Sequence, residues 1–100
     1  MKTEGRYKLR LYVTSAGARS SRAIVNVRRI CEENLYGHYE LDIVDIALHP
    51  QVARTEQLVA APTLIKLLPL PVRRFVGDMS QTARILSGLD VTAERKVAEG

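Results

Sequence analysis

Alternating apolar and polar positions mark two strands in the first half of the chain. In residues 7–13 the apolar side chains occupy every second position and belong to Tyr7, Leu9, Leu11 and Val13. This period of two predicts a strand with one buried face. Residues 39–46 alternate in the same way until Val44, where both faces become apolar. We therefore expect this second strand to be central in its sheet rather than at an edge.

A helical period separates these two strands. Within residues 21–35 the apolar residues recur every third or fourth position, at Ala23, Ile24, Val27, Ile30, Cys31 and Leu35. This spacing predicts an amphipathic helix, which Ser20 or Ser21 can cap and Gly37 can end. Strand, helix and strand in about forty residues predict a βαβ unit.

Prolines organise the second half of the chain. Three of the four prolines, Pro62, Pro69 and Pro71, lie in residues 61–78. Proline fixes φ and lacks a backbone donor, so it is excluded from central ladders and helix interiors. We therefore predict short strands at 63–68 and 73–76, joined by a stiff connection. Because X-Pro bonds have a small cis/trans preference, two chain conformations can lie close in energy here.

Two further helices complete the prediction. His49-Pro50 opens a short helix, with proline in its first turn. Ser80 caps a last helix that Gly88 ends. Residues 1–90 are expected to form a single domain and 91–100 a polar, flexible tail. The order β-α-β-α-β-β-α is typical of an α/β, thioredoxin-like fold.

Charge is distributed unevenly around a net value of +4. Residues 1–29 carry eight basic residues and one acidic residue, whereas residues 30–60 carry one basic and six acidic residues. This asymmetry favours protein partners or self-association through complementary patches. Nucleic acid binding needs a more continuous basic excess. No apolar run approaches the ~20 residues of a membrane span, so we expect a cytoplasmic protein.

Candidate catalytic chemistry is sparse. Thioredoxin chemistry needs a low-pKa thiolate at a helix N-terminus, but residues 14–20 contain no cysteine and the single Cys31 lies late in the predicted helix. A buried structural thiol is the favoured interpretation. His38 and His49 are isolated in sequence. We therefore predict a protein that is not an enzyme and has no metal or cofactor.

Lys66, Arg73 and Arg74 are the more specific polar feature. On adjacent strands these cations can form a patch on one side of the sheet. One interpretation is a partner-binding surface. The other is that charges on an edge strand discourage aggregation.

Several short motifs resemble those of the KaiB family of circadian clock proteins. They are Leu-Tyr-Val at 11–13, Ser-Arg-Ala at 21–23, Ala-Pro-Thr-Leu at 61–64, Leu-Pro-Leu-Pro-Val-Arg-Arg at 68–74 and Gly-Asp-Met-Ser at 77–80. The resemblance runs from about residue 7 to residue 90. The proline-rich motif followed by Gly-Asp is its most specific part.

The resemblance implies a non-enzymatic partner of the hexameric ATPase KaiC. Family members bind the N-terminal ATPase ring of KaiC, oppose its KaiA-stimulated autophosphorylation and sequester KaiA where that protein exists. A clock-output histidine kinase is a further possible partner. The family is also metamorphic. A ground state of order β-α-β-β-α-α-β forms tetramers or dimers, and a rare monomer adopts the thioredoxin-like order.

On this basis we expect exposed, mostly charged residues to bind the partner: Tyr7, Lys8, Arg10, Arg22, Lys66, Arg73 and Arg74. We expect the fold-switch hinge to comprise Pro62, Pro69, Pro71, Gly77, Gly88 and Asp90. We also expect the tetrameric ground state to be the more abundant form.

Two other functions stay open at this point. One is a thioredoxin-like stress or redox protein that acts without KaiC. The other is a sensor domain of a clock-associated histidine kinase, which is disfavoured because no kinase or linker sequence follows residue 100.

Overall fold

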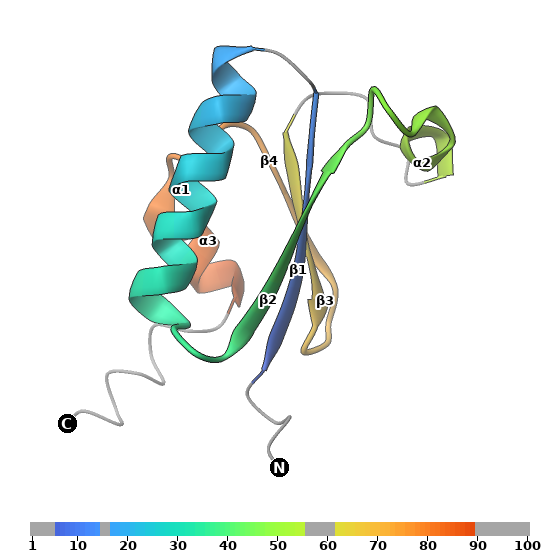
Figure 1. Ribbon diagram of the computed structural model, residues 1–100. Coiled ribbons are helices and arrows are strands. Elements are labelled where there is room, and N and C mark those ends of the chain that lie inside the picture. Colours follow the sequence, from blue (N-terminus) through green and yellow to red (C-terminus); the bar gives the residue numbers. More distant parts are fainter. Residues whose placement is uncertain (1–5, 15–16, 56–61, 90–100) are drawn as a thin grey trace, which may run out of the picture.

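The computed structural model describes residues 6–14, 17–55 and 62–89. A four-stranded sheet carries α1 and α3 on one face, and α2 lies near the end of β2, away from them (Figure 1). The elements are β1 (Tyr7–Val13), α1 (Ala18–Asn34), β2 (Tyr39–Asp45), α2 (Pro50–Thr55), β3 (Thr63–Leu68), β4 (Arg73–Val76) and α3 (Thr82–Leu89). This is the β-α-β-α-β-β-α order predicted from the sequence, and it is the rarer of the two arrangements that the resemblance implies.

The sheet has the strand order β2-β1-β3-β4. β1 runs parallel to β2 and antiparallel to β3, and Leu11 lies opposite Ile43 on one side and Leu64 on the other. The prediction that the second strand is central was wrong, because β2 forms an edge. The apolar side chains on its second face, Val44 and the following Ile46, pack in a small cluster with Val52 of α2 instead.

The main core lies between the sheet and the two helices α1 and α3. Its residues that are at most 1% exposed are Leu9, Leu11, Ala23, Val27, Cys31, Leu64 and Leu89. These come from β1, α1, β3 and α3, so burial of apolar surface holds both halves of the chain together.

α1 begins earlier than predicted. Its first residue is Ala18, and Gly17 precedes it with no side-chain cap hydrogen bond. Ser20 lies inside the first turn, where its hydroxyl accepts a hydrogen bond from the backbone N–H of Thr14 at 3.2 Å. Neither Ser20 nor Ser21 therefore caps this helix.

The position of Gly88 also differs from the prediction. Gly88 lies within α3, which continues to Leu89. A Cβ atom at this position would overlap the Phe75 ring. Gly88 therefore provides space for contact between α3 and β4, so any side chain there requires the Phe75 ring to move.

Some sequence expectations fall outside the described residues. These are the hinge position Asp90 and the flexible tail expected at 91–100. Residues 56–61, between α2 and β3, also lie outside the described ranges.

Candidate functional site

Tyr7 is not the exposed partner-binding residue that the sequence suggested. It is 9% exposed in the main core, and its hydroxyl donates a 2.8 Å hydrogen bond to the carbonyl oxygen of Leu89. Its ring shares a face with Leu9 and Leu11, so the same alternation that predicted the strand requires this burial. Tyr7 joins β1 to α3.

Lys66 is likewise buried, with no exposed surface. It lies opposite Leu9 in the β1–β3 register, on the face that α1 and α3 cover. The expected exposed patch containing Lys66 was therefore wrong. The position of a residue in a strand decides which face its side chain points to, whatever its charge. Residue 66 is on the face toward the helices.

Arg73 and Arg74 are exposed on β4 but lie on opposite faces of the sheet. Arg73 lies opposite Lys66 and Arg74 lies opposite Ile65. Successive side chains of a strand alternate between faces, so these two arginines do not form one patch.

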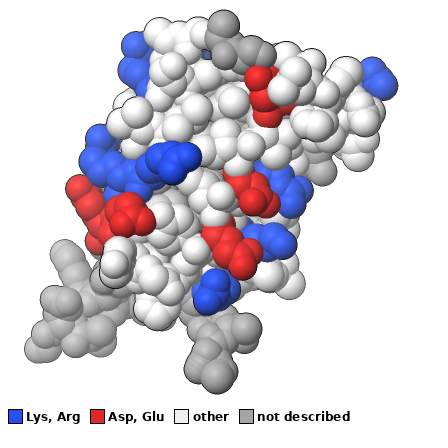
Figure 2. All heavy atoms as spheres, in the orientation of Figure 1, with Lys and Arg blue, Asp and Glu red and all other residues white. Residues whose placement is uncertain are grey.

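Lys8 and Arg10 are half-buried on the sheet face away from α1 and α3. Arg10 forms an ion pair with Asp42 of β2 at 3.8 Å, and Arg6 forms a similar pair with Glu40 at 3.7 Å. Figure 2, in which α1 lies on the left, shows several places where acidic and basic side chains lie beside one another among uncharged ones. The two ion pairs put both signs of charge on β1 and β2 rather than a continuous basic patch.

Four of the predicted hinge residues occupy three different settings. Pro62 is buried just before β3. Pro69 and Pro71 lie in the exposed β3–β4 connection, and both follow cis peptide bonds. Gly77 has φ 125°, a conformation that favours glycine, and its N–H donates to the carbonyl of Pro62 at 2.9 Å.

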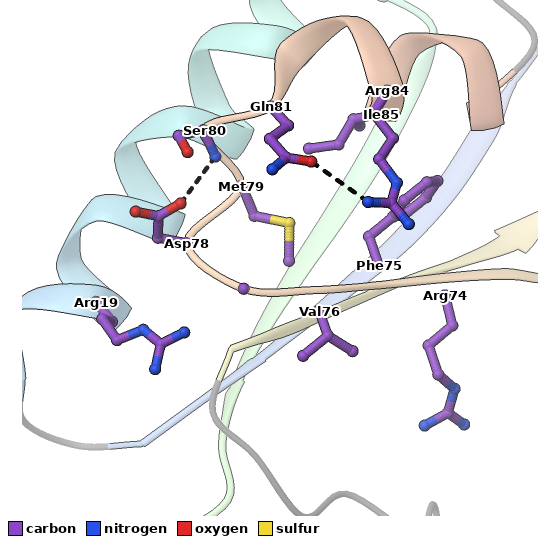
Figure 3. A pocket seen from close by; sticks show the side chains of 11 residues that line it. Arg19, Arg74, Phe75, Val76, Asp78, Met79, Ser80, Gln81, Arg84 and Ile85 are labelled. Atoms are coloured by element: carbon purple, nitrogen blue, oxygen red, sulfur yellow. Dashed lines mark hydrogen bonds between the residues drawn. The ribbon is translucent and has the colours of Figure 1, made fainter.

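A cavity of about 470 Å³ lies where β4 meets α3 and the start of α1 (Figure 3). Its lining includes Arg19, Arg74 and Arg84, but in Figure 3 the side chains of Arg74 and Val76 point to the other side of β4 from those of Gln81 and Arg84. Phe75, Val76 and Met79 contribute apolar surface. Of the predicted partner-binding residues, Arg74 is the one that lines this cavity; Arg22 contacts its Asp78.

Among the described residues that line the cavity, Asp78 is the one with a carboxylate. Hydrogen bonds from the Ser80 side chain and backbone N–H, together with the charge of Arg22, hold the pKa of Asp78 below its usual value. Asp78 is therefore ionised at neutral pH, and Arg22 forms an ion pair with it at 3.5 Å. With Asp78 paired in this way, Arg19 and Arg84 leave the cavity basic.

Sequence reasoning missed Arg19 and Arg84. Both lie in the first turn of a helix, α1 and α3 respectively, and neither first turn contains an acidic residue. A helix N-terminus carries partial positive charge, so a cation there is unfavourable for the helix. Arginines in the first turns of two helices were the available signal, and they indicate a site that attracts anions.

Cys31 lies in the main core and is 1% exposed. Burial, and secondarily the charge of Glu32, raises the pKa of its thiol to about 12. Since the thiolate is the reactive form, this cysteine is poorly suited to redox chemistry at neutral pH.

Within the described ranges, no cluster of three or more His, Cys, Asp or Glu side chains is able to hold a metal ion. Nor does any helix in that part of the chain have the length and apolar character needed to cross a membrane.

Solved structures confirm the fold. The N-terminal domain of Synechococcus elongatus SasA aligns with a TM-score of 0.70 at 22% identity, covering 84% of this chain and 79% of that one. Chloroplastic thioredoxin z aligns with the same TM-score at 13% identity, covering 88% and 81%. At these identities the likeness shows a shared thioredoxin-like fold.

Sequence relatives identify the family. Circadian clock protein KaiB3 of Synechocystis sp. is 47% identical over 89 residues, which is 89% of this chain and 87% of the relative. Circadian clock oscillator protein KaiB of Nostoc punctiforme is 39% identical over 100 residues, covering 100% and 95%. Residues 10–91 match the KaiB domain. The chain therefore belongs to the KaiB family of circadian clock proteins.

Proposed function

We propose that this chain is a non-enzymatic timing regulator that binds the N-terminal ATPase ring of a KaiC-like protein. The match of residues 10–91 to the KaiB domain carries the proposal. By this proposal the bound form has the arrangement described here, reached by a fold switch from a tetrameric or dimeric ground state. It acts in the cytoplasm, opposes autophosphorylation of the ring, and sequesters KaiA where that protein is present. A clock-output kinase is a further proposed partner.

The basic cavity at β4 and α3 is our proposed docking site for an acidic segment of the ring. Its arginines and the two helix N-termini give it a positive potential that attracts carboxylates. The apolar edge of Phe75 offers contact for a neighbouring apolar side chain. The newly found Arg19 and Arg84 would then contact the partner inside the cavity. Arg74, from the sequence-based set, would contact it beside the cavity, from the other side of β4.

The other predicted residues have different proposed roles. Arg73, Lys8 and Arg10 lie outside this cavity and would at most contact a partner elsewhere on the sheet. Tyr7 and Lys66 are buried, so they would support the fold of the bound form.

Binding to the ring is tested by mixing the wild-type chain with a hexameric KaiC-like ATPase and with its isolated N-terminal ring. We expect a complex with both by native mass spectrometry, and slower net autophosphorylation of the full hexamer. Slow complex formation is expected because half of the domain must refold first. A chain that leaves the ring unbound after prolonged incubation, and its phosphorylation unchanged, would falsify the proposal.

A redox function without KaiC is the competing proposal, and the burial of Cys31 disfavours it. We expect Cys31 in the folded chain to react with a thiol reagent at mildly alkaline pH far more slowly than in denaturant, because its pKa is about 12 and its side chain is buried. The rate is measured by absorbance of the released thiolate. Rapid labelling of the native chain, or turnover of a disulfide substrate, would revive the redox function.

A further inference from the structure

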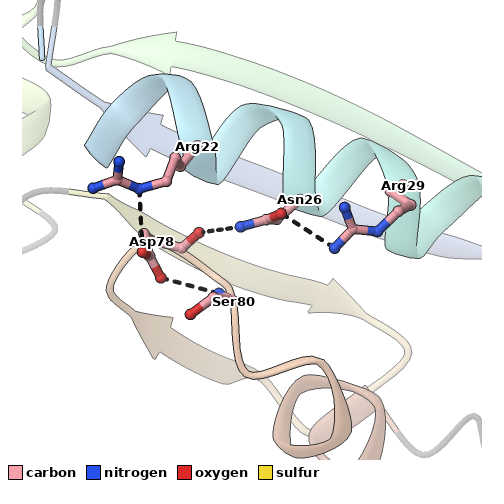
Figure 4. A network of polar contacts seen from close by, with 5 residues as sticks. All are labelled: Arg22, Asn26, Arg29, Asp78 and Ser80. Carbon is pink, nitrogen blue, oxygen red and sulfur yellow. Dashed lines mark hydrogen bonds and ion pairs between the residues drawn. The ribbon is translucent and has the colours of Figure 1, made fainter. Parts of the chain in front are cut away.

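A small polar network joins α1 to the turn between β4 and α3 (Figure 4). The guanidinium of Arg22 pairs with the Asp78 carboxylate at 3.5 Å. One helical turn later, the side-chain amide of Asn26 donates a 2.9 Å hydrogen bond to the backbone carbonyl of Asp78. A spacing of four residues places Arg22 and Asn26 on one face of α1, so both contact Asp78 in the turn. We call these two contacts the Asp78 latch.

The turn held by the latch has a strained backbone. Met79 has φ 64°, a left-handed conformation that is uncommon for a residue with a side chain. Such conformations persist where the surroundings fix them. Here the Met79 side chain is 4% exposed in the core, and the Asp78 carboxylate accepts a 3.1 Å hydrogen bond from the N–H of Ser80. The latch, the core and the Ser80 bond therefore fix this turn together.

The latch also connects two parts of the chain with different expected behaviour. α1 lies in the half that keeps its structure in both proposed arrangements, whereas Asp78 lies in the half that is rebuilt. A contact present in only one of two arrangements raises the population of that arrangement. Arg22 is 58% exposed at its side chain, so its charge alone suggested a partner contact, but its geometry serves the turn.

We propose that Arg22 and Asn26 are positioning residues that select the thioredoxin-like arrangement through Asp78. This inference rests on the proposed fold switch. By it, the latch controls how often the basic cavity is assembled. The turn that the latch fixes contributes Gly77, Asp78, Met79 and Ser80 to the cavity lining. Loss of the latch would reduce the fraction of chains whose cavity is assembled.

The populations are measured without any partner, by nuclear magnetic resonance for the two sets of amide signals and by analytical ultracentrifugation for the oligomer. We expect Arg22→Ala to lower the thioredoxin-like fraction about two- to five-fold, as suits an exposed ion pair. Asn26→Ala is expected to lower it about five-fold through the lost hydrogen bond. Arg28→Ala is the matched control, because Arg28 is an exposed arginine of α1 outside the network, and it should leave both populations unchanged.

The affinity of each variant for the ring shows whether Arg22 acts by selecting the arrangement or by contacting the partner directly. If only the thioredoxin-like form binds, the apparent affinity for the ring falls by the same factor as that population. Matching factors in Arg22→Ala and Asn26→Ala support the latch. A loss of affinity with unchanged populations would make Arg22 a contact residue and overturn the latch.

The experiments distinguish failure of the proposed ring binding from failure of the latch. A wild-type chain that shows one arrangement in solution and still binds the ring would overturn the fold switch and the latch but leave ring binding intact. A chain whose populations respond to Arg22→Ala as expected, but which binds no ring, would support the latch and overturn the proposed partner.

Discussion

Replacing Leu11 with alanine is expected to lower the free energy of unfolding by about 2–5 kcal/mol. Leu11 has no exposed surface and lies in β1, between β2 and β3. Truncation removes apolar contacts on the face packed against α1 and leaves a cavity that the surrounding strands cannot easily fill. Since domains of this size are stable by about 5–15 kcal/mol, the loss is a large fraction of the total.

Denaturant unfolding followed by circular dichroism measures this change. Leu48→Ala is the matched control, because the same chemical change occurs at a side chain that is 71% exposed. We expect that control to change stability by no more than about 0.5 kcal/mol. Equal effects at the two positions would mean that β1 is not at the centre of the core.

Reversing two charges of the basic cavity is expected to have the largest effect on partner binding. The variant Arg19→Glu/Arg84→Glu places carboxylates where an acidic segment is proposed to dock. Like-charge contact across an interface costs several kcal/mol, and each 1.4 kcal/mol is a factor of ten in affinity. We therefore expect affinity for the KaiC-like ring to fall by about 100-fold or more.

The same variant is not expected to lower the stability of the fold. Both positions lie in the first turns of helices that lack acidic residues there. Glutamate in a first turn is favourable by about 0.3–1 kcal/mol, so lost binding cannot be ascribed to unfolding if thermal stability is maintained. Calorimetric titration at two salt concentrations measures the affinity, and the wild-type complex should be the more salt-sensitive.

Arg28→Glu/Arg54→Glu is the control for net charge. Both side chains are exposed and lie outside the cavity lining, while the change in net charge is identical. We expect affinity within a few-fold of wild type. Equal losses in the two double variants would show that the ring responds to overall charge, and the cavity would no longer be the docking site.

Local pattern predicted most of the fold. The strands at 63–68 and 73–76 have the predicted bounds, because Pro62 and Pro69 flank the first strand and the second is limited by Pro71 before it and Gly77 after it. The helix between β1 and β2 was also found from its period. Its start was misplaced by three residues, since Gly17 precedes it without a side-chain cap that a sequence could signal.

The burial of Lys66 and the position of the cavity depend on tertiary packing, which the sequence pattern does not indicate. Lys66 carries charge, which predicts exposure, yet its register opposite Leu9 places it under the helices. Arg19 and Arg84 are 65 positions apart in sequence, and only the packing of α1 against the β4–α3 turn brings them to one cavity. Pairings between distant segments depend on the whole fold, so no local period indicates them.

The hydrogen bond from Tyr7 to Leu89 offers an optical reporter within the native sequence. The chain has four tyrosines and no tryptophan, and this phenol changes from a buried carbonyl partner to other surroundings whenever α3 leaves β1. With Tyr12, Tyr36 and Tyr39 replaced by phenylalanine, near-ultraviolet absorption would follow undocking of the last helix in real time. Detachment of α3 could then be timed without attaching a dye to the chain.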